Sequence, residues 1–266
     1  MRSLARMHVE YRSNVLFNFF VCSLLGVSEQ PIIADSTATP GVEAQGVGKV
    51  PGLKNAEMAQ HLLRVLTPAL KGHCCKTAIS GLQECMECLG GVGYLENDDM
   101  QYNLARLYRD ANVMPIWEGT TDMMADDSVL RVLHGKPRQQ VVAALEDWVS
   151  TILKLVRRTR TFELQCDTVA GWWSNPRTSV KEATREEAEM KSRGAMDCLV
   201  DIVQGLLLLV DATSDGDEVA RLAAESWFVD KTGRTILVRQ DWKDQVEADF
   251  KMVLGVEHAR NRNAKL

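Results

Sequence analysis

Two short stretches decide how this chain folds: LGGVGY at residues 89–94 and IWEGT at residues 116–120. The first stretch follows a long run of helical periodicity, so its glycines are expected to end a helix. The second places Glu118 between an indole and a glycine, directly ahead of another predicted helix. A carboxylate there is most simply a favourable partner for the helix dipole, although it can also be positioned as a base.

The composition excludes several classes of protein. The chain has 266 residues, of which 45% are hydrophobic, enough for one large domain or two smaller ones. Its 31 basic and 36 acidic residues provide no positive field for nucleic acid. The seven cysteines are odd in number and scattered along the chain, which indicates a reducing compartment rather than a secreted disulfide framework.

The spacing of the apolar residues predicts an all-α chain. Helices are expected over residues 3–26, 55–89, 122–133, 141–155, 195–209, 217–230 and 242–254. Thr67-Pro68 should kink or restart the second helix, and a long loop is expected at 27–52. The Trp-Trp-Ser-Asn-Pro run at 172–176 predicts a turn, and 234–240 is the one strand-like segment, since 113–117 is too short to decide. These elements predict two helical bundles, residues 1–136 and 137–266.

Neither end of the chain predicts a membrane span or a secreted protein. The apolar run at 15–27 is too short to cross a bilayer, and mixed charge precedes it, so it is expected to be a core helix. At the other end, Ala264-Lys265-Leu266 is a conservative variant of the Ser-Lys-Leu peroxisomal address. Import into the peroxisome is therefore expected. The alternative is that this tripeptide occurs by chance and that the protein is cytoplasmic.

Three further motifs have simpler explanations than a binding site. The glycines at 90–93 follow a helix, whereas a dinucleotide loop follows a strand and opens a helix. A helical stretch contains the cysteines at positions 74, 75, 85 and 88. Cysteines there are expected to pack in the core rather than to bind zinc, so we expect no metal. The basic run at 157–160 is expected to be a solvated helix face, because residues 138–266 hold 19 basic against 21 acidic side chains.

Three motifs resemble those of the C-terminal helical domain of acyl-CoA dehydrogenases and occur in the same order. They are ECLGGVGY at residues 87–94, RLYRD at 106–110 and IWEGT at 116–120. The similarity is greatest to the branch that includes the bacterial DNA-alkylation-response flavoprotein. Residues 3–26 also resemble the preceding helix of that domain, and residues 138–266 resemble the extra helical extension of the branch. The resemblance therefore implies an acyl-CoA dehydrogenase C-terminal-type bundle followed by a second helical extension.

The resemblance also implies a reaction and its residues. In the family, the residue matching Glu118 removes the α-proton of an acyl-CoA thioester, and a hydride leaves the β-carbon for FAD. The thioester carbonyl is polarised by the backbone N–H of that same Glu and by a flavin hydroxyl, and the base must be shielded from water. Glu87, Gly90 and Gly91 match positions that approach the flavin of a neighbouring subunit, and Thr120 matches a hydroxyl that contacts the cofactor. A dimer or tetramer of this chain is therefore expected.

Several departures from the family pattern leave a second reading open. Glu87 stands where Gln is usual, Trp117 where Tyr is common, and Asp122 where many members carry Gln. The family places a helical domain and a β-domain ahead of this bundle, so we expect a truncated or split form whose isolated chain binds flavin poorly. The alternative is a non-catalytic helical module for oligomerisation or partner binding. A third reading, association with nucleic acid, is disfavoured by the charge count.

Overall fold

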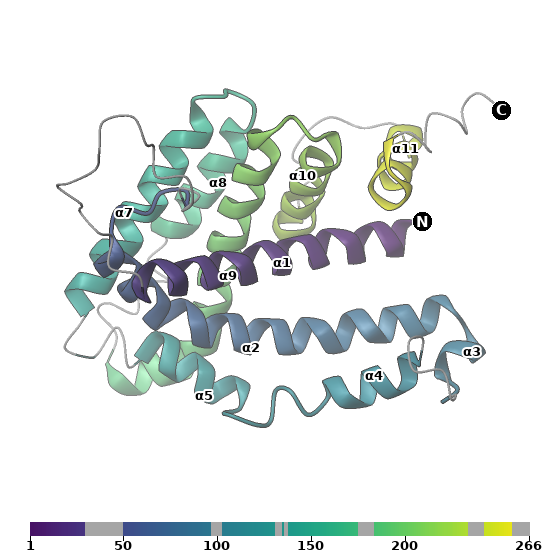
Figure 1. The fold of residues 1–266 in the computed structure, drawn as a ribbon, viewed down its shortest axis with the longest axis horizontal. Helices are drawn as coiled ribbons and strands as arrows, with labels where there is room; N and C mark the ends of the chain where they lie inside the picture. Colours follow the sequence, from purple (N-terminus) through teal and green to yellow (C-terminus); the bar gives the residue numbers. More distant parts are fainter. Residues whose placement is uncertain are drawn as a thin grey trace, which may run out of the picture.

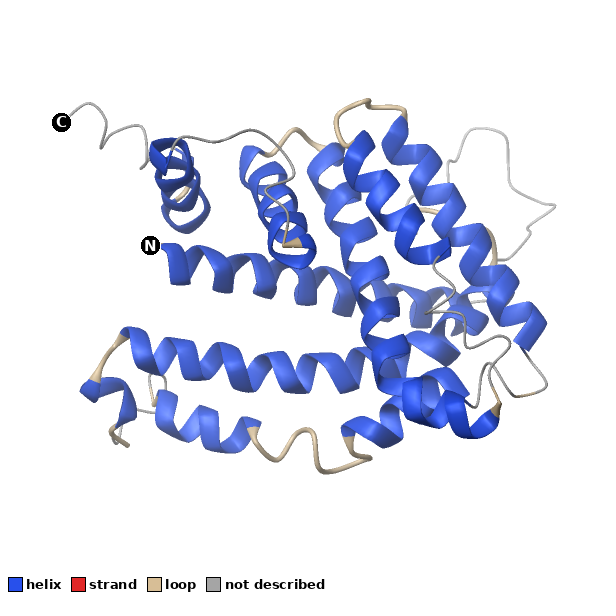
Figure 2. Cartoon of the chain, turned by 180° about the vertical axis from the view of Figure 1, so that it is seen from behind, coloured by secondary structure: helices blue, strands red, loops and turns tan. Residues whose placement is uncertain are grey.

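The computed structural model describes residues 1–29, 50–96, 103–130, 135, 138–174, 184–233 and 242–256. Within these ranges every regular element is helical and none is a strand, as Figure 2 shows. The prediction of an all-α chain is therefore confirmed. The strand-like segment at 234–240, most of the loop expected at 27–52 and the C-terminal tripeptide lie outside the described residues.

The described helices differ widely in length, from four to 33 residues. They are α1 (Arg2–Glu29), α2 (Ala56–Cys88), α3 (Gly91–Tyr94), α4 (Leu104–Ala111), α5 (Thr121–Ala125), the π-helical turn η1 (Asp126–Leu130), α7 (Arg138–Arg157), α8 (Glu163–Ser174), α9 (Arg185–Ser214), α10 (Glu218–Thr232) and α11 (Trp242–Leu254).

The antiparallel pair α1 and α2 forms the centre of the fold (Figure 1). On one side of this pair, α3, α4 and α5 run back along α2. On the other side α9, α10 and α11 pack against α1, while α7 contacts both α2 and α9. Helix α1 is therefore shared between the first part of the chain and the C-terminal helices.

Local signals fix where α2 and α10 begin and where α2 ends. Asn55 accepts a hydrogen bond from the backbone N–H of Met58 at 2.8 Å, and Asp217 caps α10 through the N–H of Val219 at 2.9 Å. Gly90 has φ of +63°, a conformation that suits glycine and ends the long helix after Leu89.

Two expectations are wrong: a restart of α2 at Pro68 and a turn that already begins at Trp172. Helix α2 does not restart at Pro68, because this proline is itself buried inside one continuous element whose packing offsets the lost backbone hydrogen bond. Helix α8 continues through Trp172 to Ser174, where a turn was expected. The indole ring of Trp172 is stacked on the ring of Phe228 in α10, with 6.0 Å between the ring centroids. This packing extends α8 up to the Asn-Pro pair in the sequence.

The buried apolar side chains form one cluster that includes residues from α1, α2 and α7 to α11. Phe20 of α1 stacks on Trp148 of α7 at 4.9 Å, and the consecutive residues 202–209 of α9 are all buried. The expected division between residues 1–136 and 137–266 falls at positions 136 and 137, which lie outside the described residues.

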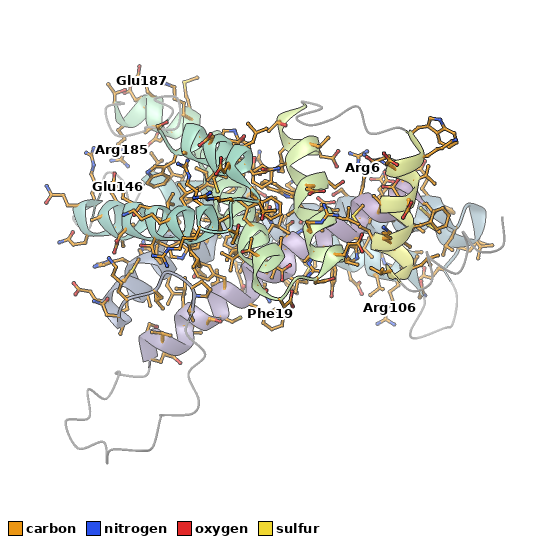
Figure 3. The ribbon with its side chains drawn as sticks, turned by 90° about the horizontal axis from the view of Figure 1, so that it is seen from above. Arg6, Phe19, Arg106, Glu146, Arg185 and Glu187 are labelled. Atoms are coloured by element: carbon orange, nitrogen blue, oxygen red, sulfur yellow. The ribbon has the colours of Figure 1, made fainter. Side chains whose placement is uncertain are left out.

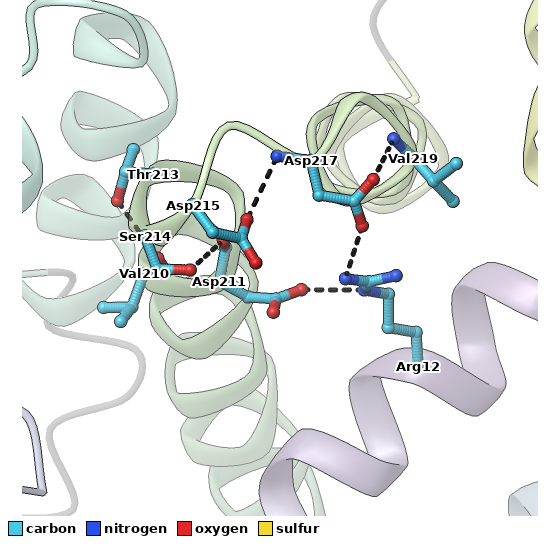
Figure 4. Close-up of polar contacts among 8 residues, drawn as sticks. All are labelled: Arg12, Val210, Asp211, Thr213, Ser214, Asp215, Asp217 and Val219. Carbon is cyan, nitrogen blue, oxygen red and sulfur yellow. Dashed lines mark hydrogen bonds and ion pairs between the residues drawn. The ribbon is translucent and has the colours of Figure 1, made fainter. Parts of the chain in front are cut away.

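A polar contact fastens α1 to the corner between α9 and α10. Arg12 donates to Asp211 at 2.7 Å and to Asp217 at 3.3 Å, as Figure 4 shows. The hydrogen bonds and charges of these two carboxylates outweigh the effect of burial and raise the pKa of Arg12 above its ordinary value. Since Asp217 also caps α10, one carboxylate both starts that helix and docks it on α1.

Other long side chains point outward. Phe19 and Arg106 lie at the outer edge of the helices in the view of Figure 3, in keeping with an exposed fraction of 65% for Phe19. In the part of the chain that the structure describes, no helix combines the length and the apolar character needed to cross a membrane.

Candidate active site

Glu118 ends a run of turns that connects α4 to α5. Residues 112–118 form successive turns, with the N–H of Ile116 donating to the carbonyl of Val113 at 2.9 Å. Glu118 itself has φ of +57°, and Gly119 follows with φ of +115°. Thr120 then caps α5 through the N–H of Met123 at 3.5 Å. A non-glycine residue with positive φ is uncommon, and such residues gather at functional sites.

A lysine from α2 holds this segment on both sides of Glu118. Lys71 donates from its Nζ to the backbone carbonyl of Trp117 at 2.9 Å and also to the carbonyl of Gly119. Sequence reasoning missed this residue, since Lys71 and Trp117 are 46 positions apart and nothing in the spacing links them. The segment is therefore tied to the middle of α2.

The described residues leave Glu118 exposed to solvent. Its neighbours Ile116 and Trp117 are also exposed, by 65% and 57% of their surface. The shielding from water that a thioester base requires is thus not provided by this part of the chain.

The glycine-rich stretch divides into two kinds of position. At Gly90 and Gly91 a Cβ atom would meet nothing within 4 Å, so bare backbone faces open space beside the exposed Glu87. At Gly93 a Cβ would stand 2.2 Å from the carbonyl oxygen of Met86, so this glycine is needed for packing within the chain. Only Gly90 and Gly91 are thus open to close approach by a ligand.

The predicted site residues form two groups that are far apart in one chain. Lys71 marks the position of Glu118 and Thr120, while Glu87, Gly90 and Gly91 lie at the end of α2. The helix rises by about 1.5 Å per residue, which separates Lys71 from Cys88 by about 26 Å. The two groups do not converge within one chain, and the resemblance assigns them to different subunits around a shared cofactor.

Asp122, the acidic departure from the family pattern, has a partner on the C-terminal extension. Arg193 of α9 lies 3.3 Å from its carboxylate, although both side chains are largely solvent-exposed. The negative charge that would oppose a nearby phosphate is therefore balanced by a cation. The sequence did not indicate this pairing, which joins residues 71 positions apart.

Of the cysteines of α2, Cys74, Cys75 and Cys85 are half-buried, whereas Cys88 is exposed and does not have the packing role expected for it. Burial raises the pKa of the Cys74 thiol to about 12, with the neighbouring Cys75 adding to the shift, so Cys74 stays protonated. No group of three or more His, Cys, Asp or Glu side chains in the described ranges could hold a metal ion. An apolar groove of about 660 Å³ does lie between α1 and α2, and Lys71 is among its lining residues.

Part of the chain matches a family model. Residues 52–133 match the model described as "Acyl-CoA dehydrogenase, C-terminal domain". This segment spans the whole of α2, the glycine-rich stop, α4 and the turn that carries Glu118. Residues 52–133 are therefore similar to the C-terminal domain of acyl-CoA dehydrogenases.

Curated relatives and a solved structure support this assignment. The chain is 37% identical over 134 residues to acyl-CoA dehydrogenase family member 11 of Caenorhabditis elegans, and 46% identical over 71 residues to AidB of Escherichia coli. These matches cover 50% and 27% of this chain, but only 17% and 12% of the relatives. The structure of C. elegans ACDH-11 in complex with C11-CoA matches 95% of this chain and 39% of its own, with a TM-score of 0.61 and 26% identity.

Proposed function

We propose that this chain supplies the base-carrying part of an acyl-CoA dehydrogenase-type flavoprotein, which oxidises the bond between the α- and β-carbons of an acyl-CoA thioester. The observation that carries the proposal is Glu118, which stands in the matched domain, in a left-handed conformation, clamped through both flanking carbonyls. The C. elegans structure with C11-CoA bound supports an acyl-CoA thioester as the class of substrate.

The proposed reaction gives a task to Glu118, Lys71 and Arg193. Glu118 accepts the α-proton, and its backbone N–H donates to the thioester carbonyl, which stabilises the charge that develops there. Lys71 holds the segment, and Arg193 balances Asp122. Proton removal then depends on how the assembly excludes water around the exposed carboxylate.

The residues present fit one edge of FAD, which accepts the hydride from the β-carbon when it is bound. Bare backbone at Gly90 and Gly91 leaves room for a nucleotide to approach closely. Thr120 keeps its hydroxyl at the exposed start of α5, where a second hydrogen bond can reach a cofactor. These contacts enclose only part of a flavin, so a second copy or further domains must cover the rest.

The apolar surface beside these residues supports such an assembly. Val92, Leu95, Ile116 and Trp117 are each more than half exposed, the first by 71%. They lie in two groups, one at the glycine-rich stop and one beside Glu118, and exposed apolar side chains of this size mark interaction surfaces. We therefore propose a homo-oligomer in which both groups are buried.

The test replaces the base without changing its size. We expect the assembly isolated with this chain to contain flavin, and an added acyl-CoA to bleach the flavin absorption band under anaerobic conditions. In Glu118→Gln the flavin should remain bound, while the rate of bleaching falls by about 10³-fold, the typical contribution of a general base.

Glu84→Gln is the matched control, because Glu84 is an exposed carboxylate on α2 away from the Glu118 segment. Its bleaching rate should equal that of the wild type. Bleaching at the wild-type rate in Glu118→Gln would contradict the assigned base. A stable oligomer that contains no flavin would instead favour the non-catalytic helical module.

A further inference from the structure

Lys71 makes an unusual pair of contacts with the backbone around Glu118. Its single ammonium group donates to the carbonyl that precedes Glu118 and to the carbonyl that follows it. Both carbonyls therefore face α2, from which Lys71 projects. An ammonium group that binds two backbone carbonyls with one residue between them fixes the path of the backbone at that residue.

The conformation of Glu118 explains why such a clamp is needed. Its φ of +57° lies in the left-handed region, which is unfavourable for a residue that carries a Cβ. Gly119 takes a positive φ as well, and a Cβ there would stand 2.5 Å from the Cε of Met124. The backbone around the carboxylate is thus strained, and the two lysine contacts hold it in place.

The clamp also sets the direction of a hydrogen-bond donor. The carbonyl of Trp117 and the N–H of Glu118 belong to one peptide unit, and no described peptide bond is cis. In a trans peptide these two groups point in opposite directions. Because the Trp117 carbonyl points toward Lys71, the Glu118 N–H points away from Lys71.

We propose that Lys71 is a positioning residue that fixes both the backbone of Glu118 and the direction of its N–H donor. The ammonium group does not touch the substrate. It acts through the two carbonyls and keeps the segment ready for the transition state, so that its loss slows the chemical step more than it weakens substrate binding. The catalytic half of this proposal rests on the proposed function, whereas the positioning of the segment does not.

The first experiment measures the segment itself and needs neither flavin nor substrate. Hydrogen exchange followed by mass spectrometry is compared for the wild-type chain and Lys71→Met in peptides that cover residues 112–124. Loss of the two charged donors should raise exchange of these amides by about tenfold. Lys76→Met, an exposed lysine farther along the same helix, should leave the exchange unchanged.

The second experiment measures catalysis in the flavin-containing assembly. Lys71→Met should lower kcat by about tenfold with little change in KM, and Lys71→Arg, which keeps two donors, should recover part of the loss. A purely structural defect would instead lower the amount of active enzyme. The kcat and KM of the correctly assembled molecules would then stay at their wild-type values.

The outcomes separate this inference from the proposed function. Equal exchange in wild type and Lys71→Met, or faster exchange that is spread evenly over α2 and α4, would overturn the positioning role. Faster local exchange with unchanged kcat would overturn its catalytic consequence. A wild-type assembly without dehydrogenase activity would count against the proposed function alone, because the exchange measurement still decides whether Lys71 holds the segment.

Discussion

Two stretches of this chain are rich in apolar residues and differ sharply in burial. In α9, every residue from 202 to 209 is buried. Between residues 104 and 120, which include Leu107, Ile116 and Trp117, only Ala111 is buried. The difference lies in the neighbours, since α9 packs against α1, α7, α8 and α10, whereas α4 packs on α2 and α3.

The contrast teaches that apolar content alone does not mark the core of this chain. The residues of α9 are stabilised by removal from water within the chain. Those around Glu118 remain exposed, although apolar surface of this extent is unfavourable in a free monomer. Residues 104–120 are therefore the stretch that the proposed homo-oligomer would bury.

The largest expected effect tests the buried side of this comparison. Leu208 is fully buried in α9, so Leu208→Ala should lower the free energy of unfolding by about 3 kcal/mol. Ile116 is 65% exposed, and Ile116→Ala should change it by less than about 0.5 kcal/mol. Urea unfolding of the isolated chain measures both values. A loss at Ile116 as large as the loss at Leu208 would show that the exposed face is part of the monomer's core.

A smaller effect separates two glycines of the glycine-rich stretch, one exposed and one buried. Gly93→Ala forces a Cβ against the Met86 carbonyl oxygen and should cost about 2 kcal/mol of stability. Gly91→Ala has open space and should leave stability within about 0.5 kcal/mol of the wild type. It should instead lower flavin retention in the assembly, as measured by the ratio of flavin to protein. Equal flavin content in wild type and Gly91→Ala would remove Gly91 from the cofactor site.

The smallest expected effect concerns the half-buried imidazole of His73 in α2. Burial, with the charge of Lys231 adding to it, lowers the pKa of His73 from 6.5 to about 4. Folded His73 therefore stays neutral between these values while the unfolded chain takes up a proton, so stability is complete above pH 6.5 and falls as the pH drops toward 4. Between pH 7.5 and 5.5 the wild type should lose about 1 kcal/mol relative to His73→Gln.

The comparison with the variant is essential for this measurement. Burial raises the pKa of Glu10 and of Asp201, and these carboxyls favour the folded state as the pH falls. Their opposing effect is common to both proteins and cancels in the difference. A difference between wild type and His73→Gln that does not change with pH would mean that the imidazole is solvated in the folded chain.

Much of the fold could be predicted from the sequence because local signals set the helix ends. Asn55 and Asp217 cap helices near the positions where the periodicity begins, and the expected range 242–254 coincides with α11. The failures arise where tertiary contacts override a local signal. Pro68 lies inside a continuous helix, and Trp172 extends α8 by stacking on α10.

The candidate site was less accessible to sequence reasoning. The resemblance located Glu118 and the glycines, but it could not separate the open Gly91 from the tightly packed Gly93. Nor could it find Lys71 or Arg193, whose partners are distant in the chain and are met through backbone carbonyls or a surface carboxylate. Such contacts depend on how helices are placed beside one another, and no local pattern encodes that placement.

The unbroken length of α2 has a final consequence. The number of residues in this helix sets the distance between the Glu118 segment and the glycine-rich stop. One inserted residue between Lys71 and Cys88 would push the two ends about 1.5 Å farther apart and rotate one against the other by about 100°. Substitutions along this span are therefore far easier to accommodate than insertions or deletions.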